Sequence, residues 1–272
     1  MNKRTISSII IAVVLITIVA IHNPIVDTIF VVLLSVGGIY EYNKAFKQAG
    51  YHPIEWVGYI SSLTIFFMGG YIEVQTKLTL AKILIPILII LMFIYIFLKD
   101  LKVNIIDLAI SFLEVVYIPF MFSFIKLILS MNQGKLLVMF VLFGAFSSDV
   151  FAYLVGSRIG KRKLCPTISP KKTVEGSIAG IIGVIVSYII IAVVGNTNYG
   201  TNFNYIYICI FGLVASIVGQ FGDLAASSIK RHCNIKDFGN ILPGHGGVLD
   251  RCDSIMFVAP IVYIFLKVYM GM

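Results

Sequence analysis

Charged residues are scarce in this chain of 272 residues, making up only 12% of it, whereas hydrophobic residues make up 59%. A soluble domain of this length needs far more polar surface to face water, so this composition excludes that class. Apolar runs of about 20 residues, the length of a helix that crosses the hydrocarbon core, recur from end to end. The sequence therefore predicts an all-α, polytopic membrane protein.

The alternation of apolar and polar residues that marks barrel strands is missing, so the spans are expected to be helices, which satisfy their own backbone groups in lipid. Pro119 interrupts the long fifth span, so a kink or a tilt is expected there. We divide the chain into N-terminal transmembrane helices (1–130) and C-terminal catalytic helices (131–272) with polar loops at 158–173 and 230–251. Nine spans are predicted, at residues 5–21, 26–41, 56–73, 79–98, 104–130, 135–157, 174–195, 204–229 and 251–268.

Cysteine is also rare, and the four cysteines lack the close paired spacing of a disulfide framework, so reduced thiols are expected. His232, Cys233, His245 and Cys252 fit no usual zinc spacing. The first span has no small-residue cleavage pattern after it, which favours a retained helix over a signal peptide.

Basic residues lie mostly on one side of the predicted topology. That side holds 16 of the 21 lysines and arginines. Because cytosolic loops attract basic residues, we expect a multi-pass protein of the cell membrane with a cytosolic N-terminus and an external C-terminus. The net charge of +8 is then explained by anionic lipid, and no nucleic-acid partner is expected.

Four aspartates lie near the predicted cytosolic ends of spans: Asp149, Asp223, Asp250 and Asp253. A carboxylate inside a helix bundle is costly unless it is paired or binds a cation. Each acid could pair with a nearby lysine or arginine. We favour the alternative, in which the acids share Mg²⁺ against substrate phosphates, with one cation or two left open.

The polar loop at 158–173 ends in a pattern typical of a helix start. Ser169 is expected to be the N-cap and Pro170 to lie in the first turn. Free N–H groups there, with Lys171 and Lys172, would form an anion site. The alternative is an ordinary basic loop that lies on anionic lipid.

The second polar loop, at 230–251, combines cations with a flexible backbone. Its glycines, Gly246 and Gly247 among them, can turn successive N–H groups toward a phosphate, although glycine loops are common. His245 could donate to a phosphate or act as an acid. The basic residues of this stretch are Lys230, Arg231, Lys236 and Arg251.

Two ordered motifs occur in the C-terminal half. One is Asp149-x2-Ala152-Tyr153-x2-Gly156 with Ile168-Ser169-Pro170-Lys171-Lys172-Thr173-x-Glu175-Gly176. The other is Ser227-x-Ile229-Lys230-Arg231-x4-Lys236-Asp237-x-Gly239-x2-Leu242-Pro243-x-His245-Gly246-Gly247-Val248-x-Asp250-Arg251-x-Asp253. Both motifs resemble the phosphatidate cytidylyltransferase (CDP-diacylglycerol synthase) family. The similarity covers mainly residues 140–270, and Val174 and Cys252 depart from the family pattern.

The resemblance implies that CTP and phosphatidate react to give CDP-diacylglycerol and pyrophosphate, with membrane lipids as surroundings and a homodimer as assembly. It implies metal ligands at Asp149, Asp223, Asp250 and Asp253. It implies phosphate contacts at Ser169, Lys171, Lys172, Lys236, Gly246 and Gly247. Catalytic roles would fall on Asp223, Lys230, Arg231, His245, Asp250, Arg251 and Asp253.

Two rival functions remain. A CDP-alcohol phosphatidyltransferase also sets paired aspartates at the membrane surface, but its usual Asp-x2-Asp-Gly run is absent, since Ser254 follows Asp253. A transporter could use Asp107, Glu114 and Asp149 along a path, but no repeated half is seen. For Asp107 and Glu114 we favour a structural hydrogen-bonding role.

Overall fold

The structure is a computed structural model that describes residues 17, 18, 21, 23–65, 74–99, 103–241 and 246–269. The chain forms two compact units. The first comprises Met1–Ser130 with His232–Asp250, and the second comprises Met131–Arg231 with Arg251–Met272. Almost all of the predicted span at 5–21 lies outside the described residues.

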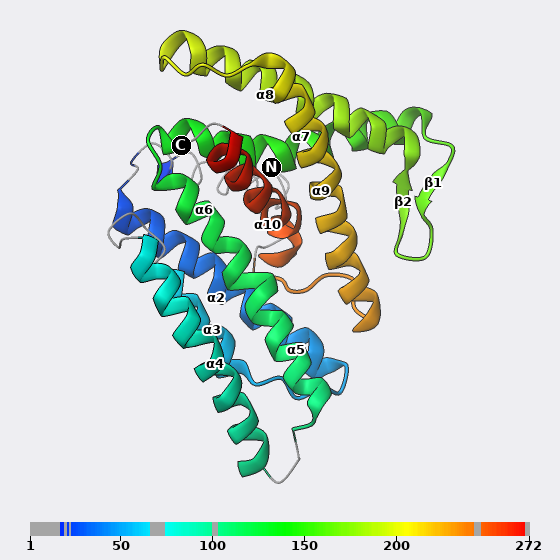
Figure 1. The fold of residues 1–272 in the computed structure, drawn as a ribbon. Coiled ribbons are helices and arrows are strands. Elements are labelled where there is room, and N and C mark those ends of the chain that lie inside the picture. Colours follow the sequence, from blue (N-terminus) through cyan, green and yellow to red (C-terminus); the bar gives the residue numbers. More distant parts are fainter. Residues whose placement is uncertain are drawn as a thin grey trace. The chain divides into compact units, whose positions relative to one another are not determined.

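The helices of the first unit are formed by the N-terminal half of the chain (Figure 1). Asn23 caps the first of them by accepting hydrogen bonds from the N–H groups of Ile25 and Val26. The span here was predicted to end at residue 41, but the helix continues to Gln48. The residues after 41 include good helix formers, and the helix ends before Gly50, which has φ of 89°. The elements are α2 (Pro24–Gln48), α3 (Glu55–Leu63), α4 (Val74–Leu98), α5 (Ile105–Val115), η2 (Val116–Phe120) and α6 (Met121–Leu129).

The irregularity expected at Pro119 takes the form of a π-helical turn, η2, between α5 and α6. Proline has no N–H group, and a π turn shifts the neighbouring hydrogen bonds around it. The stretch Ile105–Leu129 remains one apolar segment of 25 residues, long enough to cross a membrane.

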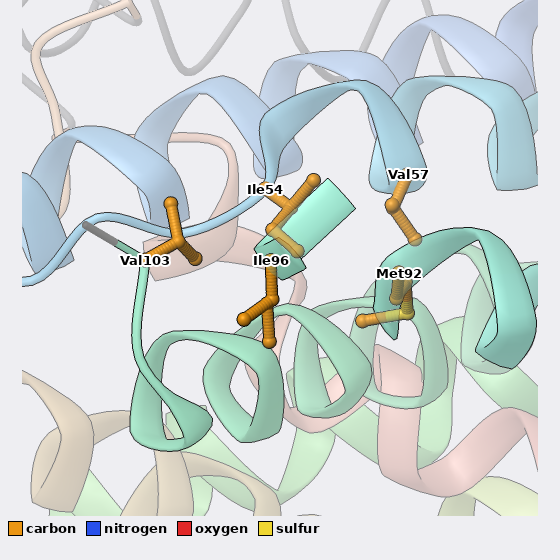
Figure 2. Packing of buried hydrophobic residues seen from close by; sticks show 5 residues of the cluster. All are labelled: Ile54, Val57, Met92, Ile96 and Val103. Atoms are coloured by element: carbon orange, nitrogen blue, oxygen red, sulfur yellow. The ribbon is translucent and has the colours of Figure 1, made fainter. Parts of the chain in front are cut away.

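Helices α3 and α4 share an apolar cluster, drawn in Figure 2, in which side chains of both helices meet. Ile54 immediately precedes α3, and Val57 lies in α3. Met92 and Ile96 belong to α4, and Val103 lies in the segment that follows α4. All five side chains are buried, so this cluster supplies the apolar core on that side of the first unit.

Buried polar contacts link α2 to its neighbours. The hydroxyls of Ser35 and Ser62 are 2.8 Å apart, and the Asn43 amide donates to Glu114 Oε1 at 2.8 Å. A Cβ at Gly58 would lie 2.0 Å from the same Glu114 oxygen, so only glycine allows this approach of α3. Small residues and interhelical hydrogen bonds are the usual means of packing helices in a membrane.

The second unit contains a two-stranded antiparallel hairpin that joins two long helices (Figure 1). In the hairpin Lys163 pairs with Thr173, and Cys165 pairs with Ser169. The elements are α7 (Gly134–Ile159), β1 (Lys163–Cys165), β2 (Ser169–Thr173), α8 (Val174–Asn198), α9 (Tyr205–His232), α10 (Leu249–Ile264) and η3 (Phe265–Tyr269). The last residue of α9, His232, and the first two of α10, Leu249 and Asp250, belong to the first unit.

The prediction that Ser169 starts a helix is wrong. Ser169 begins the strand β2, and the N-cap of α8 is Thr173, whose hydroxyl accepts a hydrogen bond from Gly176 N–H at 3.2 Å. Both residue types cap well, and strand pairing with β1 gives the backbone of 169–173 an alternative set of partners. The helix begins at Val174, where the predicted membrane span 174–195 begins.

Helices α7 and α8 approach closely because glycines lie between them. A Cβ on Gly176 would be 2.7 Å from the carbonyl oxygen of Ala152 and 3.2 Å from Gly156 Cα. Further along, the Phe140 and Tyr188 rings pack edge to face with centroids 4.9 Å apart. These contacts fix the pair of helices that carries the hairpin.

Five of the described helical segments are long and apolar enough to cross a membrane, which confirms the all-α polytopic fold class. The number of spans stays a prediction, because parts of the predicted spans 5–21 and 56–73 are not described. The five segments are Pro24–Gln48, Ile105–Leu129, Gly134–Ile159, Val174–Asn198 and Tyr205–His232.

The close packing at Gly144 on α7 gives a first prediction. A Cβ there would lie 2.5 Å from the Tyr188 hydroxyl and 2.9 Å from Val258 Cγ1. Gly144→Val is expected to destabilise the protein by about 1–3 kcal/mol, because overpacking forces the helices apart. Thermal unfolding in detergent measures this. Val186→Ile adds bulk at an exposed position of α8 and is the control. Equal melting temperatures for the two variants would contradict the packing described here.

Candidate active site

The second unit contains a cavity of about 340 Å³ between the helices α7, α8 and α9 and the hairpin. Asp149, Tyr153 and Gly156 all line it, as predicted for residues that share one face of α7. Lys171 and Lys172 of β2 line it as well. The cavity thus brings the two parts of the first motif together, beside Asp223 of α9.

An ion pair connects the hairpin to α9 in this cavity. Lys172 Nζ lies 2.6 Å from Asp223 Oδ2, and the two side chains are 23% and 28% exposed. Lys172 Nζ also donates to the carbonyl oxygen of Gln220 at 3.5 Å, and Ser227 Oγ donates to Asp223 Oδ1 at 3.3 Å. Because water reaches the pair only in part, the attraction is screened less than that of a surface pair.

Asp149, Asp223 and Asp253 lie near enough to one another for their charges to interact. Lys172 and Arg251 attract Asp149, and Lys230 attracts Asp253. Asp253 is 7% exposed and accepts a hydrogen bond from Ser254 N–H at 2.7 Å. The site therefore combines three carboxylates with cations from β2, α9 and α10.

Hard carboxylate oxygens are the ligands that Mg²⁺ prefers, so this donor set is of the right chemical type. Lys172 engages one oxygen of Asp223. In the described part of the chain, no three histidine, cysteine, aspartate or glutamate side chains are grouped closely enough to hold a metal ion. A cation here would therefore require the carboxylates to move together and Lys172 to leave Asp223.

An uncharged polar group that we did not predict also lines the cavity. The Gln220 side chain exchanges hydrogen bonds with Ser177 of α8, and its amide donates to Ser216 Oγ at 3.3 Å. Gln220 lies three residues before Asp223, so the two share a helix face. The sequence signal that could have identified Gln220 is its position as the single glutamine of an otherwise largely apolar span.

Ser169, a predicted phosphate contact, and Arg231, a predicted catalytic residue, have other contacts in the structure. Ser169 is half-buried in β2, opposite Cys165. Arg231 is exposed, and its Nε donates to the carbonyl oxygen of Ile168 at 3.2 Å, which ties the end of α9 to the turn of the hairpin. Neither residue lines the cavity as described.

The remaining predicted residues lie in the first unit. Asp250 Oδ2 accepts hydrogen bonds from the N–H groups of Phe238, at 2.8 Å, and Gly247, at 2.9 Å. Gly246 has φ of 85°, a conformation that favours glycine, and Lys236 is exposed. Asp250 therefore organises the polar loop, and the N–H of Gly247 points to it. His245 lies outside the described residues.

Asp107 and Glu114 have the structural roles that we favoured. Asp107 forms a capping box with Asn104 at the start of α5 and accepts a hydrogen bond from His52 N–H at 2.7 Å. Glu114 accepts from Asn43. All four cysteines are free thiols, and the His232 ring stacks on Tyr51 and shares a hydrogen bond of 3.0 Å with its hydroxyl.

The chain matches a known protein family and is similar to several known proteins. A model of the family described as the cytidylyltransferase family matches residues 2–269 of the chain. A phosphatidate cytidylyltransferase of Bacillus subtilis is 42% identical over 158 residues, which are 58% of this chain and 57% of that protein. A Staphylococcus haemolyticus protein of the same name is 37% identical over 172 residues, 63% of this chain and 64% of that protein.

A third relative with that name, from Thermotoga maritima, is 36% identical over 160 residues, which are 58% of this chain and 59% of that protein. The chain thus spans about three fifths of the length of these curated relatives.

The ion pair between Lys172 and Asp223 gives a second prediction, which concerns stability. Lys172→Met should lower the melting temperature, because it leaves Asp223 beside two other carboxylates without its cation. Asp223→Asn in the same protein should restore most of the loss, which corresponds to a coupling of about 1 kcal/mol for a partly exposed pair. Thermal unfolding of the wild type, both single variants and the double variant measures the coupling. Strictly additive effects would contradict a direct interaction.

Proposed function

Since the chain belongs to the cytidylyltransferase family, we propose that it transfers a cytidylyl group from CTP to phosphatidate. A phosphate oxygen of phosphatidate attacks the α-phosphorus of CTP. The bond from that phosphorus to the bridging oxygen breaks, so that CDP-diacylglycerol forms and pyrophosphate leaves. The cavity that joins Asp149, Lys172 and Asp223 within membrane-length helices is the observation that carries this proposal.

The chemistry needs little from a protein base, because the attacking phosphate is already ionised at neutral pH. The difficulty is to bring two polyanions together and to neutralise the charge that develops on pyrophosphate. Positioning and electrostatic stabilisation carry most of the catalysis in such transfers. A half-buried cluster of aspartates and cations at the end of membrane helices suits that task.

We assign Lys172 and Lys171 to the substrate phosphates, because both line the cavity. In the structure Lys172 neutralises Asp223, and an incoming phosphate offers it a second anionic partner. Binding would then free Asp223 for a cation. Lys230 and Arg251, which interact with the aspartates, would compensate the remaining charge.

We assign Mg²⁺ to Asp149, Asp223 and Asp253, with Asp250 as a further ligand. When bound, Mg²⁺ supplies positive charge to the triphosphate and to the leaving pyrophosphate. The other predicted phosphate contacts and catalytic residues stay predictions: Ser169, Arg231, Lys236, His245, Gly246 and Gly247. We assign no number of bound cations.

The third prediction concerns activity. Purified protein with labelled CTP, phosphatidate and Mg²⁺ should form CDP-diacylglycerol, and omission of Mg²⁺ should abolish the product. Asp223→Asn should reduce the rate at least about 100-fold, because it removes charge from the centre of the site. Glu55→Gln, at a partly exposed glutamate outside both motifs, is the control and should retain the wild-type rate.

A protein that makes no labelled lipid from CTP would contradict the proposal. Use of CDP-diacylglycerol with an alcohol would point to a phosphatidyltransferase instead, and solute uptake into vesicles would point to a transporter.

We further propose that the N-terminus and the site face the cytosol and that the C-terminus lies outside; a homodimer stays a prediction. Asn198, an exposed residue at the end of α8, would then lie on the external side. As the fourth prediction, a cysteine placed there in a cysteine-free background should react with an impermeant maleimide on intact cells. A cysteine at Lys161 should react only after lysis. The opposite pattern would overturn this orientation.

A further inference from the structure

Glu41, in the polar end of α2, has a wholly buried side chain that reaches a segment more than 200 residues later. Its Oε2 accepts a hydrogen bond from the N–H of Leu249 at 3.0 Å. Leu249 is the first residue of α10, so this N–H has no partner inside its own helix. The start of α10 is therefore tied to α2 by one carboxylate.

Two glycines of the polar loop lie against the same carboxylate. A Cβ at Gly239 would be 2.4 Å from Glu41 Oε1, and a Cβ at Gly247 would be 2.3 Å from Glu41 Oε2. Both distances are far below contact distance, so any larger residue at either position would displace the loop or the acid. The Glu41 carboxylate is thus in close contact with both glycines.

Asp250 holds this loop from within. It accepts hydrogen bonds from Phe238 N–H and Gly247 N–H, so Gly247 lies between two carboxylates, with its N–H toward Asp250 and its Cα against Glu41. The position of the Asp250 side chain and that of the loop therefore depend on one another, and Glu41 sets both relative to α2.

Helix α2 is a firm support for this contact. The Tyr42 hydroxyl donates to the carbonyl oxygen of Ile110 at 3.2 Å, and the Asn43 amide donates to Glu114. Gly37 and Gly38, one turn before Glu41, face the side chains of Val248 and Leu249, and a Cβ on either would lie within 3.2 Å of them. Both sides of the loop contact are therefore packed.

Stability alone does not account for an acid at this position. Glu41 Oε1 has no hydrogen-bond partner among the described residues, and burial of a carboxylate with few partners costs free energy. A neutral side chain of the same shape would avoid that cost. The charge of Glu41 is explained if the loop must be held in one conformation by two carboxylates, Glu41 through the N–H of Leu249 and Asp250 through two other N–H groups.

We propose that Glu41 is a positioning residue, which fixes Gly239 and the segment Gly247–Asp250 and thereby places Asp250 for substrate phosphates and their cation. Glu41 does not touch the substrates itself. The inference rests on the function proposed above for the reaction, whereas the anchoring of the loop can be measured without it.

The fifth prediction compares Glu41→Gln with Glu114→Gln. Both residues are fully buried glutamates of apolar helices, and Glu114 bonds to Asn43 rather than to the loop. Glutamine keeps the shape of Glu41 and one acceptor oxygen but loses the charge, so the N–H of Leu249 should be held less strongly and the loop should loosen. In Glu41→Gln, kcat should fall at least about tenfold with a melting temperature similar to that of Glu114→Gln, whose kcat should remain near that of the wild type.

Glu41→Asp restores the charge on a shorter side chain and should recover part of the activity, which a purely steric role would not predict. Loss of activity in Glu41→Gln only in proportion to the folded fraction, or a kcat equal to that of the wild type, would overturn the proposal.

Amide hydrogen exchange in detergent separates this inference from the proposed reaction. Exchange at Leu249 should be at least about tenfold faster in Glu41→Gln than in Glu114→Gln, because its N–H then donates to a neutral amide oxygen instead of a carboxylate. Exchange at Gly247, whose N–H donates to Asp250, should rise with it as the loop loosens. If the wild type makes no CDP-diacylglycerol but exchange in Glu41→Gln rises as expected, the proposed reaction is refuted and the anchoring of the loop by Glu41 is supported. Unchanged exchange at both amides would refute the anchor.

Discussion

Compensation of buried charge is the constraint on which the rest of this structure depends. Apolar helices offer a carboxylate neither water nor many donors, so each acid needs a cation or backbone N–H groups. Asp223 pairs with Lys172, and Asp250 accepts two N–H groups of its loop. Glu41 takes the N–H at the start of α10. The acids that hold the polar segments in place are thus the same kind of group that the proposed chemistry uses.

Much of the fold follows from residue type and length alone. Continuous apolar runs require helices in lipid, and the helices Gly134–Ile159 and Val174–Asn198 begin within a residue of the predicted membrane spans 135–157 and 174–195. The helical spacing of Asp149 and Tyr153 correctly placed both on one face, which proves to line the cavity. Local periodicity was sufficient for these features, because they lie within single helices.

Features that depend on contacts between distant segments could not be predicted in this way. Ser169 and Thr173 are both good caps, and only pairing with Lys163–Cys165 selects the second. Gln220 lacks charge and had no assigned role until α8 placed Ser177 beside it. The sequence alone assigns no role to Glu41, because its partner Leu249 is more than 200 residues away. Hydropathy records burial, but not which chain segment provides the partner.

Equilibrium binding of labelled CTP tests the central claim most directly, namely that the cations and aspartates of the cavity hold the substrate phosphates. Purified wild-type protein with Mg²⁺ should bind CTP, and Lys172→Met should weaken binding at least about tenfold, because the cavity loses a cation while its carboxylates remain. Equal affinity in the two proteins would contradict the account, since Lys172 would then contribute nothing to nucleotide binding.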